Sequence, residues 1–225
     1  MKLGYVIAID GPSGAGKSTV ARELAKKLGY RYIDTGAMYR AAALAADRER
    51  VDLKDAAELA RFLSRLEIRQ EMSGENVITL LGGEDVSEAI RRTDMGLKAS
   101  AISALPPVRE RLTALQREMG RKGGVVMEGR DIGTVVFPDA DYKFFVTASA
   151  EERARRRCEE LRQKGETVEL AAVLGDIRKR DHDDSTRVLA PLRRAPGAVE
   201  IETTTQNVQQ VVDAIATRLA GKGAG

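Results

Sequence analysis

The sequence is poor in aromatic residues, cysteine and histidine, and each shortage argues against a class of function. It has no tryptophan, 4% aromatic residues, one cysteine and one histidine in 225 residues. Few aromatic rings leave few stacking platforms for single-stranded nucleic acid. Cys158 has no partner for an internal disulfide, and Cys158 with His182 falls short of the ligand set of a usual metal site. We therefore interpret both residues as incidental.

Charge of one sign and long hydrophobic runs are also lacking. The 37 basic and 34 acidic residues leave a net charge of +3. Basic residues are densest between Arg153 and Arg194, but acidic residues interleave with them, unlike a continuous basic groove. No apolar run approaches the ~20 residues of a membrane span, and no cleavable signal pattern begins the chain. We expect a cytoplasmic protein without nucleic-acid or membrane partners.

The most informative feature present is a glycine-rich segment near the start. Gly11–Ser18 reads GPSGAGKS and matches GxxxxGK[ST] between an apolar run at 5–9 and a helical pattern at 20–28. Such a loop turns backbone N–H groups toward a polyphosphate, with Lys17 beside the outer phosphates and Ser18 beside magnesium. The dinucleotide pattern GxGxxG does not fit, because the glycines fall at 11, 14 and 16 and a lysine follows.

Strands and helices alternate along the rest of the chain. We expect strands near 5–9, 30–33, 77–81, 125–127, 143–146 and 199–202, and helices near 20–28, 36–46, 59–66, 108–119, 151–162, 168–180 and 208–219. The alternation predicts an α/β fold with a parallel sheet. The hydrophobic fraction of 43% is enough for a core, and the length of 225 residues suits one domain with an insertion better than two domains. A hairpin is expected within 66–85 and a disordered tail at 221–225.

Two further strand ends carry residues suited to phosphate. Ligands of open α/β sheets bind beyond the carboxyl ends of the strands. The segment 34–40 (DTGAMYR) follows one predicted strand and 128–131 (EGRD) follows another. A guanidinium matches a phosphate with two parallel hydrogen bonds, so Arg40 and Arg130 favour a second phosphate site. For either arginine alone, a surface salt bridge is the alternative.

Six segments in order resemble the bacterial cytidylate kinase family, which are P-loop nucleoside monophosphate kinases. They are IDGPSGAGKST at 9–19, DTGAMYRA at 34–41, GEDVSEAIR at 83–91, EGRDIGTVVFPDA at 128–140, ASAEERARRR at 148–157 and APL at 190–192. The resemblance implies phosphoryl transfer from ATP, with Mg²⁺, to CMP or dCMP by a monomer. It also implies a three-layer fold in one kinase domain over 1–225, divided into a core (1–61, 106–152, 166–220), a monophosphate-binding insertion (62–105) and a lid (153–165).

The resemblance also assigns site residues. ATP would bind the loop, with Ser18 on the metal: Gly11, Pro12, Ser13, Gly14, Ala15, Gly16, Lys17, Ser18 and Thr19. The acceptor phosphate would contact Thr35, Arg40 and Arg130, and Tyr39 would lie near the monophosphate. Cytosine would contact Ser100, Arg109 and Asp131, ribose would contact Arg180 and Asp184, and Arg187 would complete the closed site. Lys17, Arg40 and Arg130 would be catalytic.

Several alternatives remain open at this point. Glu128 could reach magnesium through water or orient Arg130. The arginines at 153, 156 and 157 could clamp the donor phosphate, as the resemblance implies, or form a solvated helix face. Ser100, Arg109 and the run 180–184 could be ordinary helix residues. The alternative functions are another small-molecule P-loop kinase, acting on UMP, a different monophosphate or a sugar-like alcohol, and a nucleotide-dependent switch.

Overall fold

Five strands form the sheet that carries the glycine-rich loop. In a computed structural model, which describes residues 3–74, 76–92, 94–163 and 165–221, their order is β2-β6-β1-β7-β8. β1 pairs in parallel with β6 and β7, and β7 pairs in parallel with β8. This confirms the predicted parallel sheet. The strands are β1 (Val6–Asp10), β2 (Arg31–Asp34), β6 (Val125–Gly129), β7 (Tyr142–Thr147) and β8 (Val199–Glu202).

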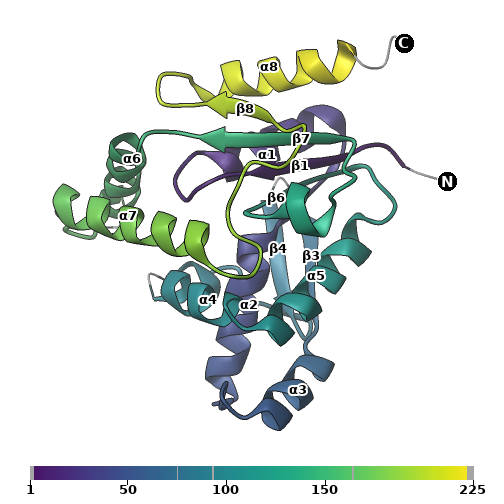
Figure 1. The fold of residues 1–225 in the computed structure, drawn as a ribbon, viewed down its shortest axis with the longest axis vertical. Coiled ribbons are helices and arrows are strands. Elements are labelled where there is room, and N and C mark those ends of the chain that lie inside the picture. Colours follow the sequence, from purple (N-terminus) through teal and green to yellow (C-terminus); the bar gives the residue numbers. More distant parts are fainter. Residues whose placement is uncertain (1–2, 75, 93, 164, 222–225) are drawn as a thin grey trace. The chain divides into compact units, whose positions relative to one another are not determined.

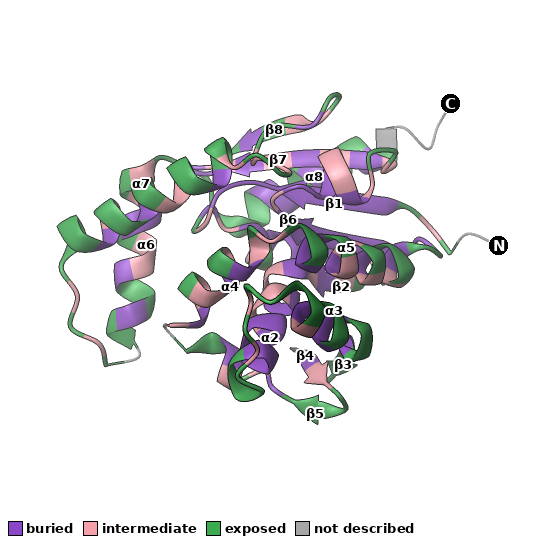
Figure 2. Cartoon of the chain, turned by 60° about the horizontal axis from the view of Figure 1, so that its bottom comes forward, coloured by how far each residue is buried: buried purple, intermediate pink, exposed green. Residues whose placement is uncertain are grey.

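The chain divides into two compact units, Met1–Tyr32 with Lys122–Gly225, and Ile33–Arg121. In the first unit, apolar faces of α1 (Lys17–Leu28) and α8 (Val208–Gly221) pack with β1 and β7 in one core. Figure 2 shows β1 as a buried strand, whereas buried and partly buried residues alternate along β7. α6 (Ala150–Gln163) and α7 (Leu170–Thr186) lie side by side and share a small core of their own (Figure 1).

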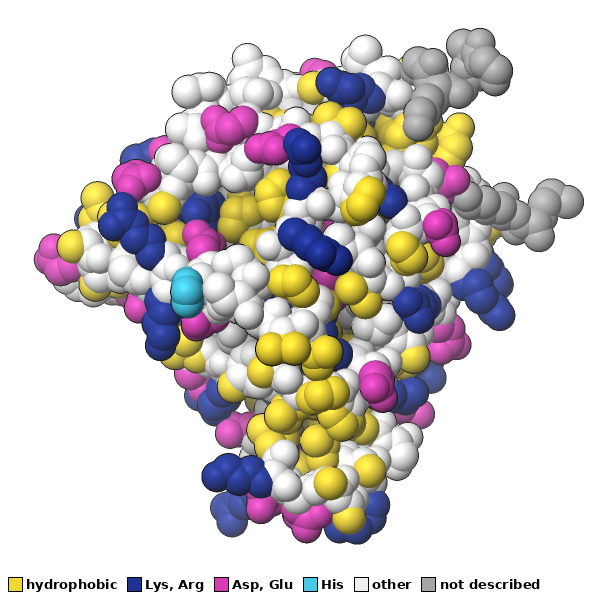
Figure 3. All heavy atoms as spheres, viewed as in Figure 1, with side chains coloured by type: hydrophobic (Ala, Val, Ile, Leu, Met, Phe, Trp, Pro, Cys, Tyr) yellow, Lys and Arg dark blue, Asp and Glu magenta, His cyan; other side chains and the backbone are white. Residues whose placement is uncertain are grey.

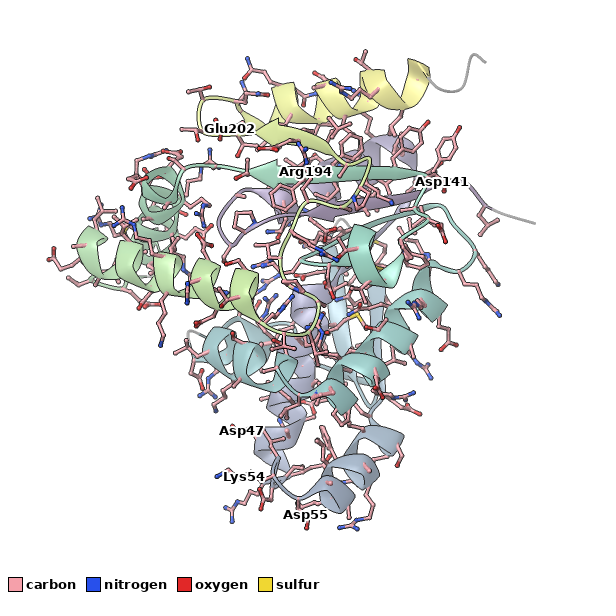
Figure 4. All side chains as sticks on the ribbon, in the orientation of Figure 1. Asp47, Lys54, Asp55, Asp141, Arg194 and Glu202 are labelled. Carbon is pink, nitrogen blue, oxygen red and sulfur yellow. The ribbon has the colours of Figure 1, made fainter. Side chains whose placement is uncertain are left out.

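The second unit is built around one alanine-rich helix. In α2 (Thr35–Arg48), the run 41–46 is buried throughout, because its small side chains let neighbouring elements approach closely. Asp55 caps α3 by accepting from two backbone N–H groups, and Figure 4 shows it at the start of that helix. The other elements are α3 (Ala56–Arg65), β3 (Ile68–Ser73), β4 (Asn76–Leu81), β5 (Glu84–Asp85), the 3₁₀ turn η1 (Ala89–Arg91), α4 (Met95–Ser103) and α5 (Pro106–Gly120).

The structure confirms the predicted hairpin and adds a third strand, β5, to it. It also adds α4 and a π-type turn, η2 (Ile132–Val136), which the sequence analysis did not delimit. Gly221 ends α8, so the predicted tail begins one residue too early, and 222–225 lie outside the described residues. The three-part division into core, insertion and lid stays a prediction.

Charged side chains of both signs are mixed on the surface, as the nearly balanced charge of the sequence suggests. Basic and acidic side chains are intermingled on the face drawn in Figure 3, so that face presents no continuous basic groove. Within the described residues, no helix has the length and apolar character needed to cross a membrane.

Glycines give the phosphate loop its shape. Gly11 has φ 149°, and a Cβ built there would lie 1.9 Å from the carbonyl oxygen of Val146 on β7. Gly14 and Gly16 have φ of 76° and 84°, a region that disfavours side chains. The loop can therefore turn tightly against β7 only with glycine at its first position.

This geometry predicts a large stability loss for Gly11→Ala. We expect about 3 kcal/mol or more, because the new Cβ overlaps a backbone atom that cannot move away freely. Gly197→Ala is the matched control, since Gly197 also has positive φ (73°) but no atom lies within 4 Å of its built Cβ. The control should lose only about 1 kcal/mol in urea unfolding. Equal losses in the two variants would contradict the packing explanation.

Candidate active site

The phosphate loop places a buried ammonium at the carboxyl end of β1. Lys17 is 5% exposed, and its Nζ donates to the carbonyl oxygen of Pro12 at 2.6 Å. Lys17 begins α1, whose first turn contains no acidic residue. The positive end of the helix, the loop N–H groups and the ammonium therefore act together, an arrangement that suits a phosphate chain.

Further cations surround this ammonium. Burial, followed by the nearby positive charge of Arg130, lowers the pKa of Lys17 from 10.5 to about 7; Arg180 acts in the same direction. The carboxylates of Glu128 and Asp10 oppose the shift only in part. Concentrated positive charge of this kind is stabilised by a bound anion, so the electrostatics favour a polyphosphate ligand.

Arg153, on α6, donates hydrogen bonds that support the phosphate loop. Its Nη1 donates to the carbonyl oxygen of Ser13 at 3.1 Å, and the same guanidinium forms two hydrogen bonds, of 3.0 and 2.6 Å, with Asp181 on α7. Its Nε donates to the carbonyl oxygen of Ala148 at 2.9 Å. Arg153 is 5% exposed, so the solvated-face interpretation is wrong for this residue.

The other two arginines of α6 differ from Arg153. Arg156 donates to the carbonyl oxygen of Thr203 at 2.6 Å and pairs with Glu152, whereas Arg157 pairs with Glu160 near the surface. Thr203 in turn donates from its hydroxyl to the carbonyl oxygen of Ala15 in the phosphate loop at 3.1 Å. Arg156 thus reaches the loop through Thr203, while a donor-phosphate clamp by these arginines stays a prediction.

Asp184 joins two of the predicted site arginines. Its carboxylate accepts from Nε of Arg130 at 3.0 Å and lies 3.5 Å from Nη1 of Arg187. Nε of Arg187 donates to the carbonyl oxygen of Ala190 at 2.7 Å, and Ala190 adopts a positive φ of 50°, which is uncommon for a residue with a side chain. The carboxylate predicted to meet ribose therefore orients two guanidinium groups in this structure; its contact with ribose stays a prediction.

Glu128 has a partner that the sequence analysis missed. The hydroxyl of Tyr32, on β2, donates to the Glu128 carboxylate, which is buried at the end of β6. Glu128 also acts on Lys17, whose pKa it raises. Its carboxylate is thus held beside the ammonium, although neither of the roles proposed from the sequence is tested.

In the second unit, the start of α2 presents Arg40. Asp34 caps this helix by accepting from the N–H of Ala37 at 2.8 Å and also accepts from Nη2 of Arg40 at 3.2 Å. A Cβ at Gly36 would lie 3.1 Å from Oδ1 of Asp34 and 3.3 Å from Nη1 of Arg40. Glycine at this position therefore lets the guanidinium fold back over the helix N-terminus, the region where an anion is favoured.

Arg109 and Tyr39 also meet in the second unit. The Arg109 guanidinium lies 5.6 Å from the centre of the Tyr39 ring and donates to the carbonyl oxygen of Ser103 at 3.2 Å. The Ser103 hydroxyl donates to the carbonyl oxygen of Ser100, so three predicted residues belong to one group on α2, α4 and α5. Thr35, predicted to meet the acceptor phosphate, is buried at the first position of α2.

The predicted residues thus fall into two sets, one in each unit. The first unit holds the loop with Arg130, Asp131, Arg180, Asp184 and Arg187, and the second holds Thr35, Tyr39, Arg40, Ser100 and Arg109. The contacts described above join residues of the same set. Arg180 contributes to the first through a 3.4 Å contact between its Nη1 and the Ser13 hydroxyl.

Magnesium would fit the start of α1. Ser18 is exposed beside the buried Lys17, so its hydroxyl is open to a hydrated ion. Over the described ranges, no three His, Cys, Asp or Glu side chains gather as a protein-only metal site. Magnesium in such a site would keep several waters and take phosphate oxygens as ligands.

The loop, its buried lysine and the parallel sheet define a P-loop phosphate-binding protein. Shikimate kinase from Acinetobacter baumannii, solved in complex with shikimate, shares the fold, with a TM-score of 0.50 at 16% identity over 100% of this chain and 97% of that one. The family model described as cytidylate kinase matches residues 7–220, and the chain belongs to that family.

Curated relatives agree with this assignment. A cytidylate kinase of Citrifermentans bemidjiense is 52% identical over 210 residues, covering 93% of this chain and 90% of the relative. One from Caldanaerobacter subterraneus subsp. tengcongensis is 52% identical over 215 residues, covering 96% and 94%. These matches confirm the resemblance found in the six sequence segments.

The lowered pKa of Lys17 predicts a pH-dependent stability. Between pH about 7 and 10.5 the folded protein binds fewer protons at this side chain than the unfolded chain does, so Lys17 makes the free energy of unfolding rise with pH in that range. In Lys17→Met this contribution should vanish. Urea unfolding of both proteins from pH 6 to 9 measures it: the variant should be relatively most stable at low pH, and its advantage should shrink as pH rises.

Lys27→Met provides the control for this measurement. Lys27 lies on the same helix but is exposed, where it pairs with Asp213. Its replacement should change the free energy of unfolding by the same small amount at each pH. A pH-independent difference between Lys17→Met and the parent protein would contradict a strained ammonium at position 17.

Proposed function

We propose that the protein transfers the γ-phosphoryl group of ATP to CMP or dCMP, giving ADP and CDP or dCDP. The observation that carries this proposal is the match of residues 7–220 to the cytidylate kinase family. The site supports it independently, because the first unit concentrates positive charge around a phosphate loop and the second presents Arg40 at a helix N-terminus.

The donor half of the site would act by placing positive charge around the phosphates of ATP. The loop N–H groups and Lys17 would bind the β- and γ-phosphates, and Ser18 would hold magnesium, which when bound neutralises charge on the phosphate oxygens. Arg153 would keep the loop in shape through its bond to the Ser13 carbonyl. Preorganised donors of this kind stabilise a phosphoryl-transfer transition state without moving during the reaction.

The acceptor half would align the attacking oxygen. Arg40 and Arg130 are proposed to bind the CMP phosphate, exchanging the carboxylates of Asp34 and Asp184 for phosphate oxygens. A phosphate monoester is an anion near neutral pH, so its oxygen needs no general base. Catalysis would then come from alignment and from the cations on the shared oxygens.

Cytosine would be recognised by a buried carboxylate. Asp131 is 5% exposed and directly follows Arg130. A carboxylate accepts from the 4-amino group of cytosine and repels the 4-carbonyl of uracil. Ser100 and Arg109 are proposed to complete the base site, and Arg180 with Asp184 the ribose site.

The two alternative functions fit less well. A kinase for an alcohol would need a base beside the hydroxyl, whereas two of the acceptor-side carboxylates, Asp34 and Asp184, are already paired with arginines. A nucleotide-dependent switch would hydrolyse ATP slowly without an acceptor. A coupled ADP-release assay with ATP and each of CMP, dCMP, UMP, AMP and GMP separates the three possibilities, and rapid release only with CMP and dCMP supports the proposal.

Lys17→Met should lower kcat with CMP by at least about 100-fold while the protein remains folded, because the variant loses the charge nearest the transferred group. Circular dichroism checks the fold, and the coupled assay measures turnover. Lys27→Met should keep parental turnover, since Lys27 lies at the exposed end of α1. Parental turnover in Lys17→Met would overturn the donor-site assignment.

Asp131→Asn should narrow the preference for CMP over UMP. A buried acceptor left unpaired costs ~1–3 kcal/mol, which corresponds to about 5- to 150-fold in selectivity. The ratio of kcat/KM for CMP and UMP measures the effect. Asp139→Asn, an exposed change eight residues along the same segment, serves as control. An unaltered ratio in Asp131→Asn would remove Asp131 from base recognition.

A further inference from the structure

A second buried carboxylate, which the sequence analysis gave no role, links β1 to the segment after β6. Asp10 is the last residue of β1 and is 2% exposed. Its Oδ1 accepts from the backbone N–H of Ile132 at 2.8 Å, and its Oδ2 accepts from the backbone N–H of Gly133 at 2.7 Å. One side chain thus holds two successive N–H groups that are more than 120 residues away in the sequence.

The two N–H groups begin the turn η2. The carbonyl oxygen of Asp131 accepts from the N–H of Val135 at 2.8 Å and of Val136 at 3.2 Å, which closes a wide π-type turn. The first N–H groups of a helical turn have no partner within it and need an acceptor from elsewhere. Asp10 supplies that acceptor for both Ile132 and Gly133.

The turn begins immediately after two predicted substrate-binding residues. Asp131 has φ −147° and ψ 23°, outside the helical region, so the direction of its side chain depends on where η2 starts. Arg130 precedes it. On the other side, Asp10 directly precedes Gly11, the first residue of the phosphate loop.

We propose that Asp10 is a positioning residue that fixes Arg130 and Asp131 in register with the phosphate loop by holding the first two N–H groups of η2. This inference rests on the proposed function, since it takes Arg130 and Asp131 to be CMP-binding residues. A shift of the turn would move Asp131 relative to the base and Arg130 relative to the phosphate.

The surroundings of Asp10 suit a structural acceptor better than a base or a metal ligand. Both of its oxygens already accept N–H groups, and the side chain is closed to solvent. Burial, opposed by the two N–H groups, raises the pKa of Asp10 to about 6; Asp131 raises it further and Lys17 lowers it. At neutral pH the side chain is therefore a carboxylate with two acceptor oxygens, as the geometry requires.

Packing holds the turn on its other side. A Cβ built on Gly133 would lie 3.2 Å from Cβ of Ala195 and from Cδ of Lys143, and 3.4 Å from Oδ2 of Asp10. The backbone of η2 thus has little room at this point. Small changes at either Asp10 or Gly133 should shift the start of the turn by a few tenths of an ångström.

The test is Asp10→Asn, which keeps the size of the side chain but places an amide NH₂ against one of the two N–H donors. We expect KM for CMP to rise by about 10-fold, as expected for the loss of one charged hydrogen bond, and the CMP-to-UMP ratio of kcat/KM to fall by a similar factor. KM for ATP should change by less than about twofold, because both Asp10 oxygens accept from η2 and the charge of Asp10 affects Lys17 less than those of Arg130, Glu128 and Arg180 do.

Asp141→Asn is the matched control. Asp141 also accepts a backbone N–H with its carboxylate, from Val6 at 2.7 Å, but at the opposite end of β1 (Figure 4). Its replacement should lower thermal stability and leave both the CMP-to-UMP ratio and KM for CMP at parental values. If Asp10→Asn lowers stability in the same way and leaves these two quantities unchanged, Asp10 is only structural and the inference is overturned.

Gly133→Ala covers the case in which Asp10→Asn does not fold. Its added methyl group presses on the same contact from the other side, and it should give the same signature in milder form, with KM for CMP raised about threefold. Parental values of KM and of the ratio in Gly133→Ala would count against the inference. Failure of the parent protein to phosphorylate CMP would instead overturn the proposed function, so the two failures are distinguishable.

Discussion

The burial of the Lys17 ammonium at the end of β1 is the constraint on which the rest of the site depends. Removing a charge from water costs several kcal/mol unless polar groups replace the lost hydration. The Pro12 carbonyl, 2.6 Å from Nζ, supplies part of that replacement, and Glu128 and Asp10 add opposite charge. The remaining strain comes first from burial and then from the positive charges of Arg130 and Arg180, and a polyphosphate would relieve it. The protein therefore keeps positive charge concentrated where an anionic substrate can use it.

Carboxylates hold the arginines of the site in place, each within its own unit. Asp34 pairs with Arg40, Asp184 with Arg130, and Asp181 with Arg153. An arginine that is already oriented loses less conformational entropy when a phosphate binds than a free side chain would. If Arg40 and Arg130 bind the acceptor phosphate as proposed, Asp34 and Asp184 would give up part of their contact with them, at some cost in affinity. Arg153 differs, since its bonds to Ser13 and Asp181 serve the loop backbone.

The sequence predicted elements whose signals are local. The helix α1 follows from the apolar spacing of Val20, Leu24 and Leu28 and from Gly29, which ends it with a φ of 66°. The loop follows from its glycines. The turn η2 was not predicted because IGTVV is β-branched and apolar, which is typical of a strand; its π-type hydrogen bonding depends on Asp10, far away in the sequence. The burial of Arg153 likewise depends on Asp181 and Ser13, and no periodic pattern on α6 indicates it.

Asp10 shows why a residue that holds a distant segment is not found from local sequence patterns, although its chemistry is specific. Two adjacent N–H groups need two acceptors on one short side chain. Serine and asparagine offer one oxygen each, and glutamate adds a methylene next to Gly133, where a built Cβ would already lie 3.4 Å from Oδ2 of Asp10. Aspartate alone among the side chains of this size presents two acceptors and no donor. Its burial raises the pKa to about 6, yet the N–H groups and Lys17 hold it ionised at neutral pH. The ammonium that is proposed to attract the donor phosphates thus also helps to keep charged the carboxylate that holds the start of η2.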